Sequence, residues 1–338
     1  MSKKKGKPET KPEGNLEQTP ENAGVQKEKK KGRGRKALSI LLIVLAALLC
    51  VFIVVYNLFS RTHEEGEVYS EETQYVFTPN ETEQKYLLFL DDFTEDEINT
   101  DVWNVPDGVR RGGYWSADEA FTKNGCLVLR TEEKDGKYYM GTVDTQGKME
   151  TGYGYYEARL YQPKASGIWT AFWLMSPVMA EKGTADVTVG GSEIDIIEAP
   201  YYNSDLVPND SYQCAVHVGD YDRSGPNFIC KEKTISPMTN KSRADISIYD
   251  GWHTFGVEWT EDYYRFYYDR QLVYEVTEKE YISPLTAYWN LSIELNGSDG
   301  VPGDPAFVLA KSVFKNPEGT FPTDFLVDYV AMYSQCPF

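Results

Sequence analysis

The sequence predicts an all-β domain, an antiparallel sandwich or barrel, preceded by one transmembrane helix. Three observations support this fold class. Residues beyond about 85 contain many short apolar and aromatic stretches of strand length, with hardly any helical periodicity between them. The chain has 25 Tyr and 15 Phe, which favour strands over helices. A long uncharged apolar run lies close to the N-terminus.

The expected strands alternate with turn signals such as Asp135-Gly136 and Asn296-Gly297. Examples are residues 126–130, 153–161, 168–175, 192–198, 212–218, 252–259, 263–268 and 325–333. Because no helix of crossover length lies between them, neighbouring strands are expected to pair antiparallel. This pattern is typical of a sandwich or a barrel.

Charge divides the chain into two unequal parts. Residues 1–60 carry 12 Lys and Arg against 5 acidic residues, whereas the remaining residues carry 22 against 47, out of 34 and 52 in the whole chain. The net charge of −18 argues against nucleic acid as the main partner, because phosphate binding needs a positive field. The two parts are therefore expected to face different surroundings.

The N-terminal part has the features of a membrane anchor with a basic leader. Residues 1–36 are rich in Lys, Glu, Pro and Gly and cannot bury enough apolar surface to fold, so we expect disorder. Residues 37–59 form an apolar run of about 34 Å as a helix, long enough to cross a bilayer. A cleaved signal peptide is the weaker interpretation, because no small-x-small pattern follows the run.

Topology follows from the charges that flank this run. Basic residues precede it, and Glu64, Glu65 and Glu67 follow it. By the positive-inside rule, the N-terminus is cytoplasmic and the rest of this single-pass chain is extracellular at the cell membrane. Residues 60–85 are expected to form a stalk, and residues 86–338 the folded domain.

Cysteine usage fits an oxidising compartment but does not fix a bridge. Cys50 lies in the apolar run, and Cys126, Cys214, Cys230 and Cys336 lie beyond it, enough for two disulfides. Cys214 and Cys230 are neighbours in this set, and we expect them to pair if one bridge forms. The sequence contains no C-x-x-C spacing of a zinc site.

One segment, residues 190–200, places acidic residues among isoleucines. Side chains on a strand alternate between faces, so Glu193 and Asp195 share a face. Glu198 would fall on the opposite face of a regular strand. One extra residue in a bulge at Ile196-Ile197 would return Glu198 to the acidic face.

Three aligned carboxylates fit three kinds of site. With the bulge, Glu193 and Glu198 would lie about 13 Å apart at Cα, and their side chains could approach the ~5–5.5 Å of a retaining glycosidase. Neighbouring like charges raise one another's pKa, which keeps one carboxyl protonated as an acid while another stays ionised. The pattern would also suit a calcium site or a solvated acidic face, although aligned like charges repel with no structural gain.

Several aromatic residues are candidates for binding a sugar. Trp169 and Trp173 share one face of their predicted strand. Aromatic rings stack on the apolar faces of sugars, so both are candidate substrate-binding residues, and the alternative is that this face is the sandwich core. Trp115 is a further candidate from an early loop. Trp289 and Glu294 are expected to border the same site.

Segments around these residues resemble glycoside hydrolase family 16, the laminarinase, lichenase and agarase relatives. The acidic strand is similar to the family's bulged E-x-D-x-x-E motif. Four further segments are similar to family motifs. Tyr153-Gly-Tyr-Tyr-Glu-Ala-Arg159 is similar to Y-G-x-x-E-A-R, and Gly167-Ile-Trp-Thr-Ala-Phe-Trp-Leu174 is similar to G-x-W-P-A-F-W-L. Gly251-Trp-His-Thr-Phe-Gly-Val-Glu-Trp259 is similar to H-x-Y-x-x-E-W, and Phe325-Leu-Val-Asp-Tyr-Val330 is similar to V-D-Y-V. The resemblance covers about residues 87–333 in family order.

The resemblance implies a β-jelly-roll sandwich whose concave sheet holds a polysaccharide groove. Carried over by position, Glu193 is the implied nucleophile and Glu198 the acid/base, and Asp195 tunes the charge and proton of the nucleophile. His217 matches a histidine on a neighbouring strand of the groove in many members, and an ordinary core or surface histidine is the alternative.

The implied chemistry requires no cofactor. Many relatives hold a structural calcium with backbone oxygens and the Asp of the last strand, and Asp328 and Gly125 match those positions here. The resemblance therefore implies a candidate structural calcium site at these two residues.

Together these features predict a membrane-anchored extracellular endo-β-glycosidase that hydrolyses β-1,3- or mixed β-1,3/1,4-glucan by retaining double displacement. Its expected partners are a polysaccharide substrate and the membrane, and not nucleic acid. The alternatives are a glycan transglycosylase using the same carboxylates, a non-catalytic glycan-binding receptor, and a calcium-dependent adhesion module. The identity of the sugar stays undetermined, because the chain departs from the family pattern at three places. Thr170 replaces the usual Pro, the segment 290–297 diverges, and residues 180–189 form an insertion.

Overall fold

The computed structural model describes residues 77–165, 167–179, 184–200, 212–219, 230–235, 247–295 and 321–338, together with Val44 in a helix. The chain divides into two compact units, Met1–Ser70 and Glu71–Phe338, and the second holds the β-structure. The expected leader and the expected anchor at 37–59 lie outside the described residues, Val44 excepted. Within the described ranges, none of the helices is both long and apolar enough to span a membrane.

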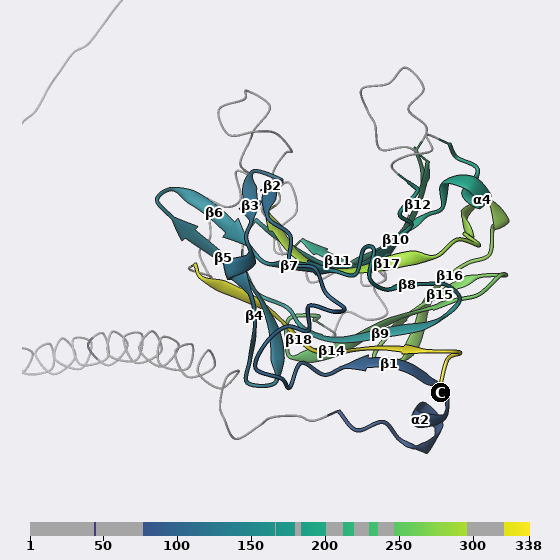
Figure 1. Ribbon diagram of the computed structural model, residues 1–338, viewed down its shortest axis with the longest axis horizontal. Helices are drawn as coiled ribbons and strands as arrows, with labels where there is room; N and C mark the ends of the chain where they lie inside the picture. Colours follow the sequence, from purple (N-terminus) through teal and green to yellow (C-terminus); the bar gives the residue numbers. More distant parts are fainter. Residues whose placement is uncertain are drawn as a thin grey trace, which may run out of the picture. The chain divides into compact units, whose positions relative to one another are not determined.

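Two packed β-sheets make up the described part of the second unit, which confirms the predicted all-β sandwich (Figure 1). The larger sheet has eleven described strands in the order β16-β15-β14-β9-β18-β5-β6-β3-β2, with β1 added on β18 and β4 on β5. Its strands are β1 (Leu87–Asp91), β2 (Gly108–Arg110), β3 (Gly113–Trp115), β4 (Ala120–Lys123), β5 (Cys126–Lys134), β6 (Lys137–Met140), β9 (Gly154–Tyr161), β14 (Trp252–Trp259), β15 (Tyr264–Tyr268), β16 (Gln271–Val276) and β18 (Thr323–Tyr333). Neighbours in this sheet run antiparallel, except β3 and β6, which are parallel.

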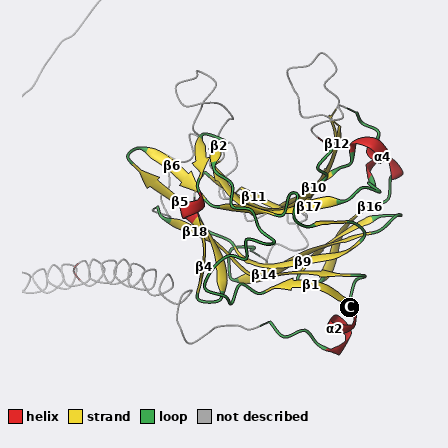
Figure 2. Ribbon diagram, in the orientation of Figure 1, coloured by secondary structure: helices red, strands yellow, loops and turns green. Residues whose placement is uncertain are grey.

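The smaller sheet lies above the larger one in Figure 1 and has seven described strands in the order β13-β12-β11-β10-β17-β7, with β8 added on β17. Its strands are β7 (Thr142–Asp144), β8 (Glu150–Thr151), β10 (Ile168–Met175), β11 (Glu193–Pro200), β12 (Gln213–Gly219), β13 (Cys230–Ile235) and β17 (Ala287–Leu295). The described helices are short (Figure 2): α2 (Glu81–Tyr86), α4 (Val187–Gly190), and the 3₁₀ turns η1 (Ala117–Glu119) and η4 (Lys279–Tyr281).

Alternating side chains build the core between the two sheets. On β10 the inward residues include Phe172 and Leu174, and on β11 they include Ile194, and all three are fully buried. They belong to one hydrophobic cluster with Val257 and Leu160 of the larger sheet. Because successive residues of a strand point to opposite faces, the residues that alternate with these inward ones lie on the outer face of the smaller sheet.

The predicted strand ranges agree closely with the observed ones at the centre of the fold. The ranges 168–175 and 252–259 coincide with β10 and β14. β17 contains most of the divergent segment that begins at Asn290, and its apolar and polar residues alternate. That alternation places its apolar residues in the core and its polar residues on the same outer face as those of β10.

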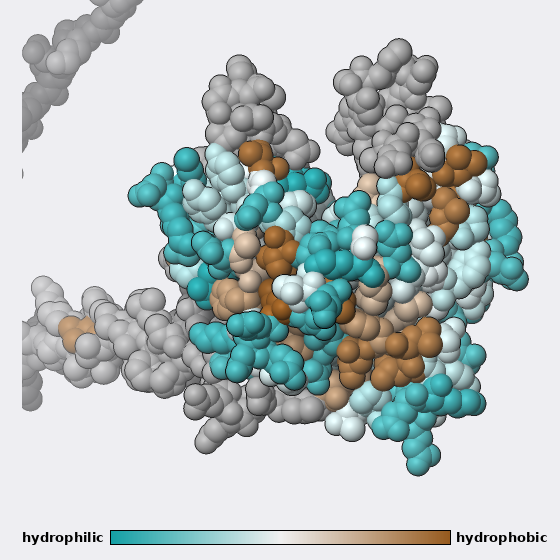
Figure 3. Space-filling model, in the orientation of Figure 1, coloured by the Kyte–Doolittle hydropathy of each residue, from teal (hydrophilic) through white to brown (hydrophobic). Residues whose placement is uncertain are grey.

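The face shown in Figure 3 is mostly hydrophilic, with apolar residues in small areas. The largest brown area lies over β1, where Leu88 is 61% exposed. The other exposed large hydrophobic residues of the described part of this unit are Val109, Tyr153, Val189, Leu272 and Phe338. Single exposed apolar residues of this kind are ordinary on a folded domain.

The expected Cys214–Cys230 disulfide does not form, and Cys214 is a buried free thiol. In the β12–β13 pair, Cys214 lies opposite Ile235, whereas Cys230 lies opposite Gly219 at the other end of the pair. Burial raises the pKa of the Cys214 thiol well above its ordinary value. The other free cysteines in the described part of the chain are Cys126 and Cys336.

The segment 77–86 is bound to the outer face of the larger sheet. α2 begins with a capping box, in which the Asn80 side chain accepts bonds from helix amides and the Glu83 carboxylate accepts one from the Asn80 amide. Arg270 joins this helix to the sheet: its Nη1 lies 2.6 Å from Glu83 Oε1, and its Nη2 lies 2.8 Å from Oε1 of Glu157 on β9. Most of this segment falls in the range assigned to the stalk from the sequence.

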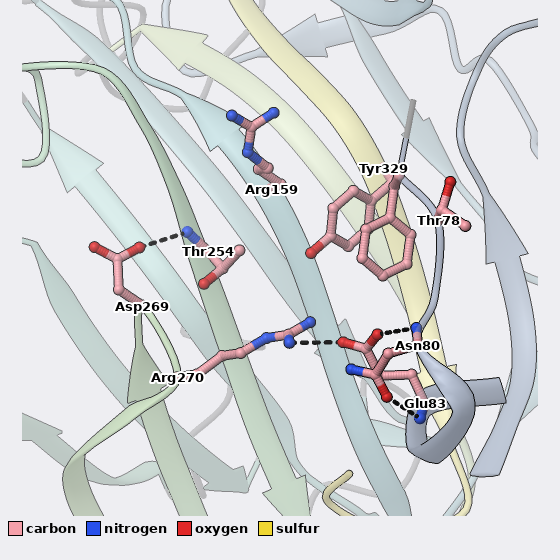
Figure 4. A pocket seen from close by; sticks show the side chains of 9 residues that line it. Thr78, Asn80, Glu83, Arg159, Thr254, Asp269, Arg270 and Tyr329 are labelled. Atoms are coloured by element: carbon pink, nitrogen blue, oxygen red, sulfur yellow. Dashed lines mark hydrogen bonds and ion pairs between the residues drawn. The ribbon is translucent and has the colours of Figure 1, made fainter. Parts of the chain in front are cut away.

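Glu157 is the centre of this network. It is fully buried, and its carboxylate also accepts hydrogen bonds from the hydroxyls of Tyr155 and Tyr329 at 2.8 Å. These partners offset the large free-energy penalty of burying an ionised carboxylate. Figure 4 shows the pocket beside the network, about 370 Å³ in volume. The pocket is lined by Phe77, Thr78, Asn80, Glu83, Arg159, Thr254, Asp269, Arg270 and Tyr329.

Candidate active site

The three acidic residues of β11 share the outer face of the smaller sheet. All three lie opposite outward-facing residues of β10. The register shifts between Asp195 and Glu198, and Ile196 and Ile197 are both buried in the core. The bulge predicted at these two isoleucines is thus confirmed, and it returns Glu198 to the face that carries Glu193.

Asp195 and His217 lie at the centre of the site. On β12, His217 pairs with Glu193, and its Nε2 lies 3.0 Å from Asp195 Oδ2. One ligand atom from each of these three residues lies within 4.8 Å of the others. Asp195 is only 2% exposed, whereas Glu193 and His217 are half-buried. The spacing of these ligand atoms would also admit a cation, which agrees with the alternative of a calcium site at these carboxylates.

Glu198 is held by donors on both of its carboxylate oxygens. The indole Nε1 of Trp169 donates to Oε1 at 3.1 Å, and Nε2 of Gln213 donates to Oε2 at 2.6 Å. Burial raises the pKa of Glu198 above its ordinary value and outweighs the Gln213 donor and the nearby cations, which lower it. A carboxyl whose pKa is raised keeps its proton to higher pH, as a general acid requires.

Two arginines and Glu294 border the site beside Trp169. Glu294 on β17 is 4% exposed, with its Oε1 2.8 Å from Arg110 Nε and its Oε2 2.8 Å from Arg111 Nε. The guanidinium of Arg111 lies 4.8 Å from the centre of the Trp169 ring, and that of Arg110 lies 5.0 Å from the Trp115 ring. This end of the site is therefore a fixed cationic and aromatic surface.

The structure brings together most of the residues singled out from the sequence. Those on the outer face of β10, β11 and β12 are Glu193, Asp195, Glu198, His217, Trp169 and Trp173. The Trp173 indole donates to Ser292 Oγ at 3.2 Å. Trp115 joins the group through Arg110. The roles of these residues in catalysis and sugar binding stay predictions.

Trp289 was expected at the site, and that expectation was wrong. Trp289 is fully buried in the core, where its Nε1 donates to Thr151 Oγ1 at 2.7 Å. On a regular strand, residues five positions apart point to opposite faces, so Trp289 and Glu294 cannot both face outward. Glu294 lies opposite Trp169 on the outer face, and Trp289 takes the inner one.

Sequence reasoning missed several polar residues of the site. Gln213 lies four residues before His217 and therefore on the same face of β12, which is a signal the sequence contains. Asn290 and Ser292 alternate with core residues on β17 in the same way. The two arginines have no such local signal, because only the fold brings them to Glu294.

Asp328 and Gly125, the implied calcium residues, belong to the larger sheet and its turns. Asp328 on β18 is buried, and its Oδ2 lies 2.8 Å from Arg159 Nη1. Burial raises the pKa of Asp328, although Arg159 lowers it. Gly125 adopts a positive φ of 71° in the turn before β5. Because a guanidinium already neutralises the carboxylate, these residues fit a calcium ion poorly.

The fold and the site define a class of protein: a β-sandwich that carries three aligned carboxylates and several tryptophans on the outer face of one sheet. A family model described as glycosyl hydrolases family 16 matches residues 110–304. The chain belongs to this family, and the family and enzyme class expected from the sequence, a glycoside hydrolase acting on O-glycosyl bonds, are confirmed at that level.

Individual relatives agree with this assignment. The endo-1,3-1,4-beta-glycanase ExoK of Rhizobium meliloti (strain 1021) is 30% identical over 200 residues, which cover 56% of this chain and 62% of that protein. The beta-glucanase of Rhodothermus marinus is 26% identical, with 64% of this chain and 70% of that protein covered. The laminarinase catalytic domain of Thermotoga maritima MSB8 has the same fold, with a TM-score of 0.56, 21% identity, and coverage of 74% of this chain and 98% of that one.

Proposed function

We propose that this chain is an endo-acting β-glucanase that cleaves β-1,3- or mixed β-1,3/1,4-glucan with retention of anomeric configuration. The observation that carries the proposal is the alignment of Glu193, Asp195 and Glu198 on one face of β11, with the bulge that keeps Glu198 there. The curated relatives named above are an endo-1,3-1,4-β-glycanase and a β-glucanase, which supports β-glucan as the substrate class.

In the proposed mechanism Glu193 is the nucleophile. It bonds to the anomeric carbon as the glycosidic C–O bond breaks, and Glu198 gives its proton to the leaving oxygen. A water molecule then loses a proton to Glu198 and bonds to the anomeric carbon, which releases Glu193. The raised pKa of Glu198 suits the first step, in which this carboxyl must be protonated. Asp195, paired with His217, holds its charge beside the nucleophile.

The proposed sugar contacts are Trp173, Trp169, Trp115 and His217. Trp173 and Trp169 are half-buried on the acidic face, and the bond to Ser292 fixes the Trp173 ring. A ring held in this way can stack on a sugar without losing further side-chain freedom.

We further propose that residues 37–59 anchor the chain in the cell membrane with the domain outside. The support lies in the sequence: an apolar run of spanning length, preceded by basic residues and followed by acidic ones. An enzyme held in this way would act on polysaccharide at the cell surface.

Replacing Glu193 or Glu198 by Gln tests the catalytic proposal. Each change keeps the shape of the side chain but removes the nucleophile or the acid, so hydrolysis of laminarin and lichenan should fall by roughly 10²–10⁴-fold or more. Reducing-end detection measures the rate, and circular dichroism checks the fold. Glu95→Gln, on an exposed turn, is the matched control and should keep full activity.

The stereochemistry of the first product separates the possible outcomes. NMR should show a β-anomer released from a β-glucan, and an α-anomer would overturn Glu193 as nucleophile. Agarose and carrageenan in the same panel distinguish a glucanase from an enzyme acting on other polysaccharides. Growth in the length of labelled oligosaccharides would instead indicate transglycosylation, and binding without any released or transferred sugar would indicate a receptor.

A further inference from the structure

We propose that Gln213 is a positioning residue that holds Oε2 of Glu198 in place and favours the ionised form of this carboxyl. The inference rests on the proposed function, because it assigns a role to the neighbour of the acid/base. It concerns a residue that no motif singled out.

The geometry limits where the proton can sit. β11 lies between β10 and β12, so Glu198 meets Trp169 from one side and Gln213 from the other. An indole N–H can donate but cannot accept a hydrogen bond. Oε1 accepts from Trp169 and Oε2 accepts from Gln213 at 2.6 Å, so the proton of the neutral carboxyl must point away from both donors.

A neutral amide suits this second oxygen. Its NH₂ group donates more strongly to an ionised carboxylate than to a protonated one, because the ionised acceptor carries the charge. Glu198 changes protonation state twice in each proposed turnover. Gln213 therefore favours the ionised state and holds Oε2 in place while the proton moves.

Charged groups also surround Glu198. Those that act on it through their charge are Arg111, His217 and Glu294. Glu193 and Asp195 lie on the same strand, and the buried neutral thiol of Cys214 lies on the adjacent one. All of them remain in place when Gln213 is replaced. A change in the pH profile of a Gln213 variant would therefore report the lost hydrogen bond.

Gln213→Leu tests the inference, because leucine has a similar volume but no polar atoms. Loss of the donor disfavours the ionised carboxylate, so the alkaline limb of kcat/KM on laminarin or lichenan should move up by about half a pH unit or more. The rate on these polymers should fall by roughly 10–100-fold. The rate on a dinitrophenyl β-glycoside, whose leaving group needs no acid, should fall much less. Gln271→Leu, exposed on β16, is the matched control.

Trp169→Phe provides a second variant, which keeps the ring and removes the N–H donor to Oε1. It should also move the alkaline limb upward, and circular dichroism should show that both variants fold. An unmoved pH profile with equal losses on the polymer and the aryl glycoside would overturn the inference. If Glu198→Gln keeps activity instead, the proposed function fails, whatever the Gln213 variant does.

Discussion

A single residue, His253, links the stability of the domain to pH. Its Nδ1 lies 2.9 Å from Asp269 Oδ2, its Nε2 lies 2.8 Å from Asp250 Oδ1, and the Tyr268 hydroxyl also reaches Nδ1. Burial alone lowers the pKa of His253, but the hydrogen bonds with Asp269 and Asp250 outweigh it, so the pKa is raised. The arrangement therefore stabilises the charged imidazolium.

We expect His253→Gln to destabilise the domain more at about pH 5.5 than at about pH 9. The folded pKa is raised above the unfolded value, so the stabilisation is fully present below about pH 6.5 and is lost as pH rises through the folded pKa. Urea unfolding of wild type and variant at both pH values measures the difference in unfolding free energy. An equal difference at the two pH values would show that the ion pairs contribute nothing.

Strand β11 and the contacts of Arg270 show which elements a sequence can predict. The acidic face of β11 and its bulge follow from local alternation, because the pattern breaks at one point only. The bond from Arg270 to Glu157 joins residues 113 positions apart, and the bond from Arg110 to Glu294 joins residues 184 apart. Local periodicity predicts strands and faces, but which charges meet across the molecule depends on the packing of distant segments.

Replacing Arg270 by Leu should destabilise the domain by about 3–5 kcal/mol, because Glu157 and Glu83 would lose their shared cation in a buried place. Lys279→Leu breaks an exposed pair with Asp262 and should change stability by about 1 kcal/mol or less. The urea midpoints of the two variants provide the measurement. Similar midpoints would mean that the buried network adds no stability.

At the scale of the whole chain, a basic N-terminal region precedes an acidic folded unit. The compact unit spans Glu71–Phe338, and its segment 77–86 is bound to the larger sheet through α2. Protease sites are therefore expected before residue 77, and the bound segment should resist cleavage.

Protease added to intact cells should release an active fragment whose first residue lies between about 60 and 77. The proposed anchor and orientation place that stretch outside the cell. N-terminal sequencing identifies the cut, and glucanase assay of the supernatant shows whether the released unit folds on its own. A C-terminal part that is cleaved only after lysis would contradict the orientation.

The bulge in β11 should let this strand lose one residue without turning its acidic face. Ile196 and Ile197 together occupy the place of one residue in the neighbouring strand. Loss of either isoleucine would restore strict alternation and still leave Glu198 facing outward, because one residue would then separate it from Asp195. In an ordinary strand, a one-residue deletion turns every later side chain to the opposite face. Here the same deletion should preserve the acidic face, because the bulge and not the length of the strand sets which way Glu198 points.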